Sequence, residues 1–281
     1  MFKLFNKGRL AALFALVALS AMSSPLMASW ECCDPCEPPS DNRFYIGAFG
    51  GGIYSNSNRI SQYGTAFFEE AVFGPLPIIA EGRLSKTSAG FGGGQIGFEF
   101  SKPGCSCWSL APAGELEAYF FKHKKNGHLI NRTVVGLPEH DFSDSFHMNS
   151  TVILANAVLS IKTDTLFGIS PYVGGGLGAA RISLYKADSL QVDPLEEGIN
   201  HFNSDRDDSS WAFAAQAKAG LRYNFCRLFH VFVEYRYLYV DSSNYIFGAT
   251  NYPTHVPTSP WNVKLKSTHF NAFAAGVQFD L

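Results

Sequence analysis

The stretch Trp211–Tyr239, WAFAAQAKAGLRYNFCRLFHVFVEYRYLY, decides the fold. Its first half alternates at every second residue. One face carries aromatic and aliphatic side chains, beginning with Trp211, and the other carries small or polar ones such as Gln216 and Lys218. The alternation stops at a turn and resumes at His230. A period of two sustained this long indicates two strands, each with a different environment on either face.

These strands are longer than the five or six residues usual in soluble sheets. A tilted strand that crosses a membrane needs about 9–11 residues, with aromatic side chains near both water interfaces. Alternation alone does not tell which face is enclosed, because a soluble lipocalin-like barrel has the same period. The strand lengths, the small residues of the polar face and the spacing of the connections favour a membrane barrel.

Composition excludes several other classes. The chain has 281 residues, a formal net charge of −2 and 15% aromatic residues. A low, balanced charge with this aromatic content does not fit a disordered chain or a nucleic-acid partner. The glycine runs Gly92–Gly94 and Gly174–Gly176 lie within strands and lack the helix that follows a phosphate loop, so we expect them to relieve crowding in a curved sheet. We expect no cofactor and no bound metal.

The N-terminus has the pattern of a secretory signal. Lys3, Lys7 and Arg9 precede the apolar run Leu10–Met22, about 13 residues long, whereas a membrane-spanning helix needs roughly 20. A small-residue cleavage site ends before Ser29. The predicted domains are a signal peptide at 1–28, a cysteine-bearing periplasmic leader at 29–43 and a barrel at 44–281, located in a bacterial outer membrane.

Eight strands are predicted, and the connections between them alternate between long and short. Outer-membrane barrels have this asymmetry, with short periplasmic turns and long outer loops. The fold class is therefore all-β, an eight-stranded antiparallel transmembrane β-barrel. The expected strands are Phe44–Tyr54, Ser88–Phe100, Gly114–His123, Met148–Lys162, Pro171–Tyr185, Trp211–Phe225, His230–Val240 and Ser267–Leu281, and the expected long loops are Ser55–Thr87, Lys124–His147, Lys186–Ser209 and Asp241–Lys266.

Short motifs add a family resemblance. The segment Pro171–Arg181, PYVGGGLGAAR, the segment Glu234–Tyr237, EYRY, and the alternating C-terminal strand resemble the OmpA-like and opacity-type surface antigens, which are eight-stranded outer-membrane barrels. Two positions depart from that family: the chain ends in Leu281 rather than Phe or Trp, and Glu234 stands where a glycine often precedes Tyr-Arg-Tyr. The resemblance implies a monomer whose partners are outer-membrane lipid or lipopolysaccharide, the barrel-assembly machinery, and host or cell-surface ligands that meet the loops.

Charges on the polar strand faces form the main candidate site. The inward positions carry five acids, with Glu115 and Asp280 among them, and five bases, and such equal numbers inside a narrow lumen predict salt bridges rather than a single-sign selectivity ring, because an unpaired buried ion is costly. We expect Glu115 and Asp280 to lie in water at strand ends. The predicted lumen network consists of Glu99, Glu117, Lys162, Arg181, Lys218, Arg222, Glu234 and Arg236.

Other clusters have weaker support. The loop 186–209 holds seven carboxylates that could attract a divalent cation, but it lacks the glycine and distal glutamate of a calcium loop, so a solvated surface is favoured. A basic group at the foot of the second outer loop could bind lipid phosphates or be ordinary rim charge. Its members are Lys122, Lys124, Lys125 and Arg132.

Catalysis has little support in the sequence. The pairs His147 with Ser150 and Thr268 with His269 have suitable residue types, but no diagnostic motif surrounds them, so we expect no enzyme. The leading interpretation is a surface protein with a structural or adhesive role through its outer loops. The alternative is a small pore for solutes, and a lipid-modifying enzyme comes third.

Six cysteines fall in the leader or in short turns. An oxidising periplasm favours disulfides among them, although the spacing Cys33-Asp34-Pro35-Cys36 also suits zinc. We expect bridges from the leader to the turn 101–113, drawn from Cys32, Cys33, Cys36, Cys105, Cys107 and Cys226.

Overall fold

The computed structural model describes residues 42–69, 74–100, 108–131, 140–163, 168–225 and 228–281. The chain divides into two units, Met1–Cys36 and Glu37–Leu281, and the first lies outside the described residues. The signal peptide and nearly all of the leader therefore lie outside them too. No helix among the described residues has the length and hydropathy to cross a bilayer.

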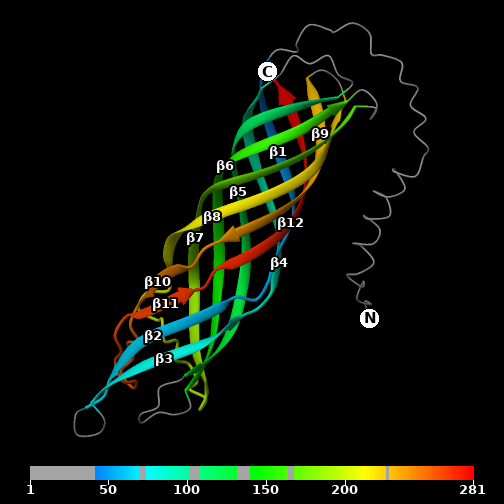
Figure 1. The fold of residues 1–281 in the computed structure, drawn as a ribbon. Coiled ribbons are helices and arrows are strands. Elements are labelled where there is room, and N and C mark those ends of the chain that lie inside the picture. Colours follow the sequence, from blue (N-terminus) through cyan, green and yellow to red (C-terminus); the bar gives the residue numbers. More distant parts are fainter. Residues whose placement is uncertain (1–41, 70–73, 101–107, 132–139, 164–167, 226–227) are drawn as a thin grey trace, which may run out of the picture. The chain divides into compact units, whose positions relative to one another are not determined.

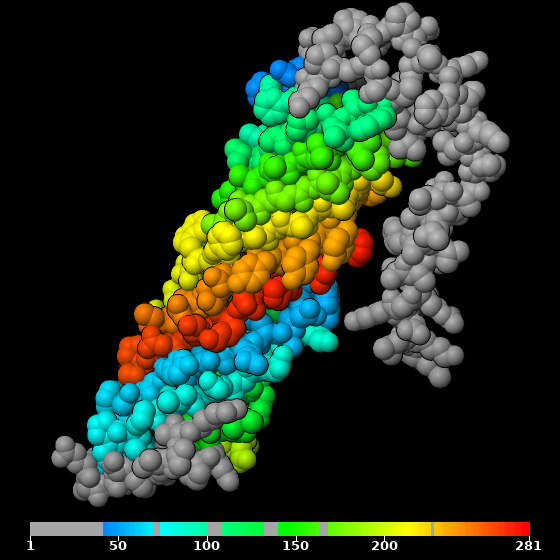
Figure 2. Space-filling view, viewed as in Figure 1, coloured from blue at the N-terminus to red at the C-terminus, as the bar shows by residue number. Residues whose placement is uncertain are grey.

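The second unit is all-β and antiparallel. Eight strands close a barrel through the pairing order β5-β4-β1-β12-β9-β8-β7-β6, and β6 pairs back with β5 (Figure 1). Figure 2 shows part of this order on one face, as oblique bands from green through yellow, orange and red to blue. The barrel strands are β1 Arg43–Ser55, β4 Thr87–Glu99, β5 Trp108–Asn131, β6 Asp141–Thr163, β7 Ile169–Asp193, β8 Asp208–Asn224, β9 Phe229–Val240 and β12 Thr268–Asp280. The predicted eight-stranded barrel is confirmed.

Much of the sequence predicted as long loops is strand. The segment between β1 and β4 forms the hairpin β2 Arg59–Phe67 and β3 Pro75–Leu84, and the segment between β9 and β12 forms β10 Ser243–Phe247 and β11 Trp261–Leu265. β11 pairs with β2, and β3 pairs with the far end of β5. Together with the ends of β5, β6 and β7, these strands extend one end of the barrel. We call this part the outer tier.

The outer tier has an apolar core of its own. Ring contacts join β6, β11, the β7–β8 connection and β10, and the centroids of Phe202 and Phe247 lie 4.6 Å apart. Trp261 is fully buried and meets Phe142 edge-on. Burial of apolar surface is the main favourable contribution to folding, and aromatic side chains bury large areas of it, so these connections form a packed body rather than solvated loops.

The barrel surface below the tier is apolar. In β8 the odd positions from Trp211 to Tyr223 point outward and the even positions from Ala212 to Arg222 point inward, as the alternation predicts. On this surface the outward positions of the eight strands carry no charged residue. The first outward cations, Lys122 and Arg181, mark the edge nearest the outer tier. We call this surface the apolar belt.

Candidate functional site

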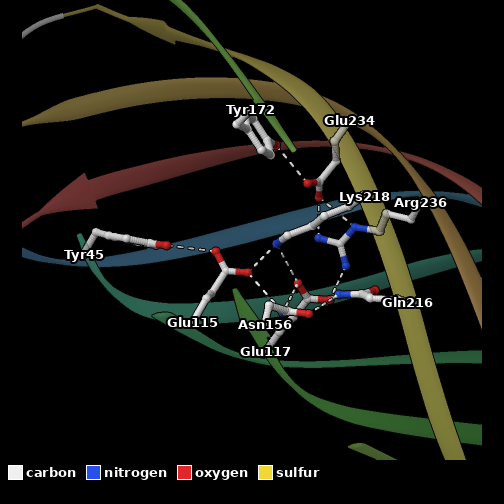
Figure 3. A network of polar contacts seen from close by, with 9 residues as sticks. All are labelled: Tyr45, Glu115, Glu117, Asn156, Tyr172, Gln216, Lys218, Glu234 and Arg236. Atoms are coloured by element: carbon white, nitrogen blue, oxygen red, sulfur yellow. Dashed lines mark hydrogen bonds and ion pairs between the residues drawn. The ribbon is translucent and has the colours of Figure 1, made fainter. Parts of the chain in front are cut away.

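Inside the belt, buried charges meet across the barrel (Figure 3). Lys218 of β8 forms ion pairs with Glu115 and Glu117 of β5, and its Nζ lies 3.1 Å from Glu117 Oε2. Arg236 of β9 pairs with the same Glu117 and with Glu234. The side chains of all five residues are at most 1% exposed. We call these five residues the central network.

Neutral polar groups complete the central network. Tyr45 donates to Glu115 at 3.0 Å, and Tyr172 donates to Glu234 at 2.8 Å. Asn156 donates to Glu115 at 3.3 Å, and Gln216 donates to Glu117 at 3.3 Å and to Asn156 at 2.8 Å. Buried charges are tolerated when each is paired and its remaining hydrogen-bonding capacity is used. These four side chains therefore help the barrel to hold three acids and two bases in its interior.

A second cluster of buried charges lies where β1 begins and β12 ends. Glu99 is paired with Lys162, with Arg222 at 3.3 Å and with Arg43 at 3.0 Å. Arg43 also reaches Asp280 at 2.6 Å. The guanidinium carbon of Arg222 lies 5.4 Å from the ring centre of Tyr172, which donates to Glu234 of the central network, so the two clusters are adjacent inside the barrel. Across both clusters five carboxylates face five cations.

Aromatic rings pack inside the barrel on the other side of the central network. The guanidinium carbon of Arg236 lies 4.0 Å from the ring centre of Phe49, and Phe49, Phe91 and Tyr119 pack against one another. Beyond them the interior holds a cavity of about 20 Å³, lined in part by Phe121 and Phe270. That is room for roughly one water molecule.

Most of the predicted lumen charges converge in these two clusters, but three predictions about individual charges are wrong. Arg181 is exposed on the outer face of β7, at the edge of the apolar belt. Glu115 and Asp280, expected in water, are 4% and 9% exposed. Arg43, assigned to the leader, begins β1 and supplies the fifth lumen cation in place of Arg181.

The basic group of the second outer loop does not form one surface. Lys122 and Lys124 point outward, whereas Lys125 is buried and donates to Asn58 at 2.9 Å. Burial lowers the pKa of Lys125 to about 8. Arg132 lies outside the described residues.

Neither hydrolase-like pair assembles. Ser150 is buried inside the barrel, while His147 on the opposite face packs on Tyr185. His269 engages the hydroxyl of Tyr237 at 2.7 Å, and the neighbouring Thr268 hydroxyl donates to Lys266. The six cysteines proposed for disulfides all lie outside the described residues.

One buried acid was not singled out from the sequence. Asp144 of β6 lies inside the outer tier and is fully buried. Burial raises its pKa to about 7, and the nearby Ser189 opposes the shift in part. Its inward place in the alternation of β6 is the only sequence signal for it.

Comparisons with known proteins give likenesses at low identity. No family model matches the chain. No curated protein matches it either. Among solved structures, the chain is similar to the outer membrane protein OprG of Pseudomonas aeruginosa (15% identity, 84% of this chain and 95% of that one, TM-score 0.46) and to Neisserial surface protein A (16% identity, 86% and 99%, TM-score 0.36). It is also similar to the outer membrane protease OmpT of Escherichia coli (8% identity, 88% and 99%, TM-score 0.41).

Proposed function

We propose that this chain is an outer-membrane surface protein of the OmpA-like or opacity type, which acts through its outer tier and does not conduct through its lumen. The observation that carries the proposal is the central network. Lys218 of β8 pairs with Glu115 and Glu117 of β5, three strands away around the barrel, and Arg236 of β9 pairs with Glu117, four strands away. Side chains that meet across a narrow barrel leave no water-filled path.

The apolar belt supports membrane insertion. Its outward side chains are exposed and apolar, including Leu177 and Phe120 at 62% and 60%. Tyr235, Tyr237 and Trp211 lie toward the edge that Arg181 and Lys122 mark. Aromatic girdles and flanking cations are what lipid-facing barrel surfaces carry at headgroup level. Lipid or lipopolysaccharide is accordingly the partner we propose for this surface.

The outer tier supports a role at the cell surface. Hydrogen bonds join the β7–β8 connection to the β10–β11 connection: Asn203 donates to the carbonyl oxygen of Asn251 at 2.8 Å, and Ser204 donates to that of Ala249 at 2.6 Å. A rigid platform that presents exposed polar side chains suits recognition of another surface, because little ordering entropy is lost on binding. We propose host or neighbouring-cell surfaces as the partner class.

Planar-bilayer recording tests the closed lumen. Purified protein should give no steady conductance, whereas Arg236→Ala, which removes a cation and its bulk from the central network, should give open steps. Reproducible steps from the unaltered protein would favour the solute pore.

Surface display tests the adhesive role. Non-adherent bacteria that display the protein should bind cultured epithelial cells more than bacteria with the empty vector. Trp261→Ala, which removes the central ring of the tier core, should abolish the gain at equal surface expression. Adhesion equal to the vector control would contradict the adhesive role while leaving the closed lumen untouched.

A further inference from the structure

Three side chains of the outer tier converge on one point away from the lumen. Glu196 and His201 belong to the connection between β7 and β8, and His255 belongs to the connection between β10 and β11. Glu196 Oε2 lies 3.5 Å from His255 Nε2 and 3.9 Å from His201 Nε2. One ligand atom from each of the three lies within 4.8 Å of the others.

The two histidines are oriented alike. His201 Nδ1 lies 3.1 Å from the carbonyl oxygen of Ser189, and His255 Nδ1 lies 2.6 Å from that of Val256. A carbonyl oxygen only accepts hydrogen bonds, so each Nδ1 must carry the proton. Each Nε2 then presents its lone pair toward Glu196. Histidines that bind metals are fixed in this way, with the second ring nitrogen donating to a carbonyl or carboxylate.

The backbone around these residues is also fixed. The amide of His201 donates to Ser189 at 2.9 Å, and its carbonyl accepts from Thr250 at 3.0 Å. The same Thr250 hydroxyl accepts from the indole of Trp261 at 3.2 Å. His201 is 3% exposed and lies in the tier core, whereas the side chains of Glu196 and His255 are 32% and 14% exposed. The cluster is therefore built on the tier core and open on one side.

An open cavity of about 370 Å³ leads to the cluster. A further imidazole, His140, lines the same cavity, and its Nδ1 is buried without a hydrogen-bond partner among the described residues. The cavity provides a route for an ion from solvent, together with an additional nitrogen donor beside the three convergent ligands.

We propose that Glu196, His201 and His255 bind one divalent transition-metal ion of the zinc class. Metal–nitrogen and metal–oxygen bonds of about 2.0–2.2 Å place tetrahedral ligand atoms about 3.3–3.5 Å apart, close to the separations between Glu196 and the two histidines. Two imidazoles and one carboxylate suit zinc, copper or nickel, whereas calcium and magnesium require mostly oxygen ligands. The acidic loop thus contributes a single carboxylate, and the nitrogen ligands distinguish this site from a calcium loop.

Zinc titration by calorimetry tests the site directly. The full chain is purified in detergent, stripped with EDTA and alkylated at its cysteines, so that thiolates do not take up the metal. We expect one Zn²⁺ per chain and no heat from Ca²⁺. Loss of a group that only orients a metal ligand lowers metal affinity by about 10–100-fold, so Glu196→Gln and His255→Gln, which remove ligands, should each lower it at least as much.

The pair His128 and Asp141 supplies a matched control. It also joins an imidazole to a carboxylate in the outer tier, at 3.4 Å, but among the described residues no third ligand converges on this pair, and His128 is 58% exposed. His128→Gln should leave zinc affinity unchanged. Absence of zinc binding, or an equal loss from His128→Gln, would overturn the proposal, as would unchanged affinity in the Glu196→Gln, His255→Gln double variant.

Proteolysis gives a second readout. A metal at this site would join two connections far apart in the sequence, and a ligand that binds only the folded state stabilises it. Zinc should slow cleavage of the outer tier by trypsin in the unaltered protein and not in Glu196→Gln. This site does not depend on the proposed function, since a protein that conducts or fails to adhere could still bind zinc here.

Discussion

Lys218 of β8 and Glu115 of β5 form an ion pair inside the barrel, although β6 and β7 separate their strands in the sheet. Both side chains are 1% exposed. The pair and its partner Glu117 therefore connect opposite parts of the wall through the interior. Removal of Lys218 would leave the carboxylates of Glu115 and Glu117 with less positive charge to balance them.

We expect Lys218→Met to destabilise the barrel by about 3–5 kcal/mol, the usual cost of breaking a buried pair from one side. Unfolding in urea, followed by tryptophan fluorescence in detergent micelles, measures this loss. Replacing both partners, as in Lys218→Met with Glu115→Gln, should recover part of the stability. Arg181→Ala is the control: that residue is exposed on the outer face, so its removal should leave the urea midpoint unchanged.

The glycine run of β7 provides a second prediction. A Cβ on Gly176 would lie 1.9 Å from Asn156 Oδ1 and 2.7 Å from the carbonyl oxygen of Ala155, whereas a Cβ on Gly175 would lie no closer than 3.5 Å to its neighbours. Asn156 donates to both Glu115 and Glu117. Gly176→Ala should therefore lower the temperature at which the barrel unfolds in SDS, and Gly175→Ala should not. Equal effects from the two variants would show that crowding at Asn156 is not the cause.

The barrel could be predicted from sequence because its strands alternate between an apolar outward face and a small or polar inward face. The other inward side chains of β8 and β9 are mostly small or apolar. Charges among them are therefore recognisable as lumen charges, namely Lys218, Arg222, Glu234 and Arg236. Arg181 was misplaced because small residues occupy both faces of β7 around Gly174–Ala180 and hide the phase of the alternation. A cation that ends an outward apolar row is also as acceptable as one inside the lumen.

The outer tier could not be predicted because its order depends on partners far apart in the chain. β2 shows no clean alternation: Ile60, Ser61 and Gln62 are all buried. It pairs with β3 on one side and with β11, about two hundred residues later, on the other, and the distant pairing is needed to satisfy the second edge of its backbone. The metal cluster was missed for the same reason. Glu196 lies in the acidic loop between β7 and β8, whereas His255 comes from the connection between β10 and β11, and nothing in the sequence joins the two.

Asp144 gives a pH prediction. Its pKa is raised from 3.8 to about 7, so the folded protein favours the protonated acid. Its contribution to stability is fully present below about pH 4, the unfolded pKa, and is lost as pH rises to about 7. Asp144→Asn should match the unaltered protein near pH 4 and become the more stable of the two by pH 8, as measured by urea midpoints. Asp188→Asn should have the opposite sign at neutral pH, because that exposed acid is paired with Arg206 at 2.5 Å. If the difference in urea midpoint between Asp144→Asn and the unaltered protein did not vary with pH, the raised pKa of Asp144 would be contradicted.

Trp261 tests whether the outer tier folds as a unit separate from the barrel wall. Its side chain is fully buried, its indole donates to Thr250, and it contacts Phe142 and His201. Truncation of a buried tryptophan to alanine typically costs about 3–5 kcal/mol. Because these contacts all lie within the tier, Trp261→Ala should expose its connections to trypsin while the barrel keeps its resistance to heat in SDS. Limited proteolysis with mass spectrometry locates the cuts, and Phe120→Ala in the apolar belt, where the side chain is 60% exposed, should produce none of them. If Trp261→Ala lowered the heat resistance of the barrel as much as it loosened the tier, the two would be one cooperative unit.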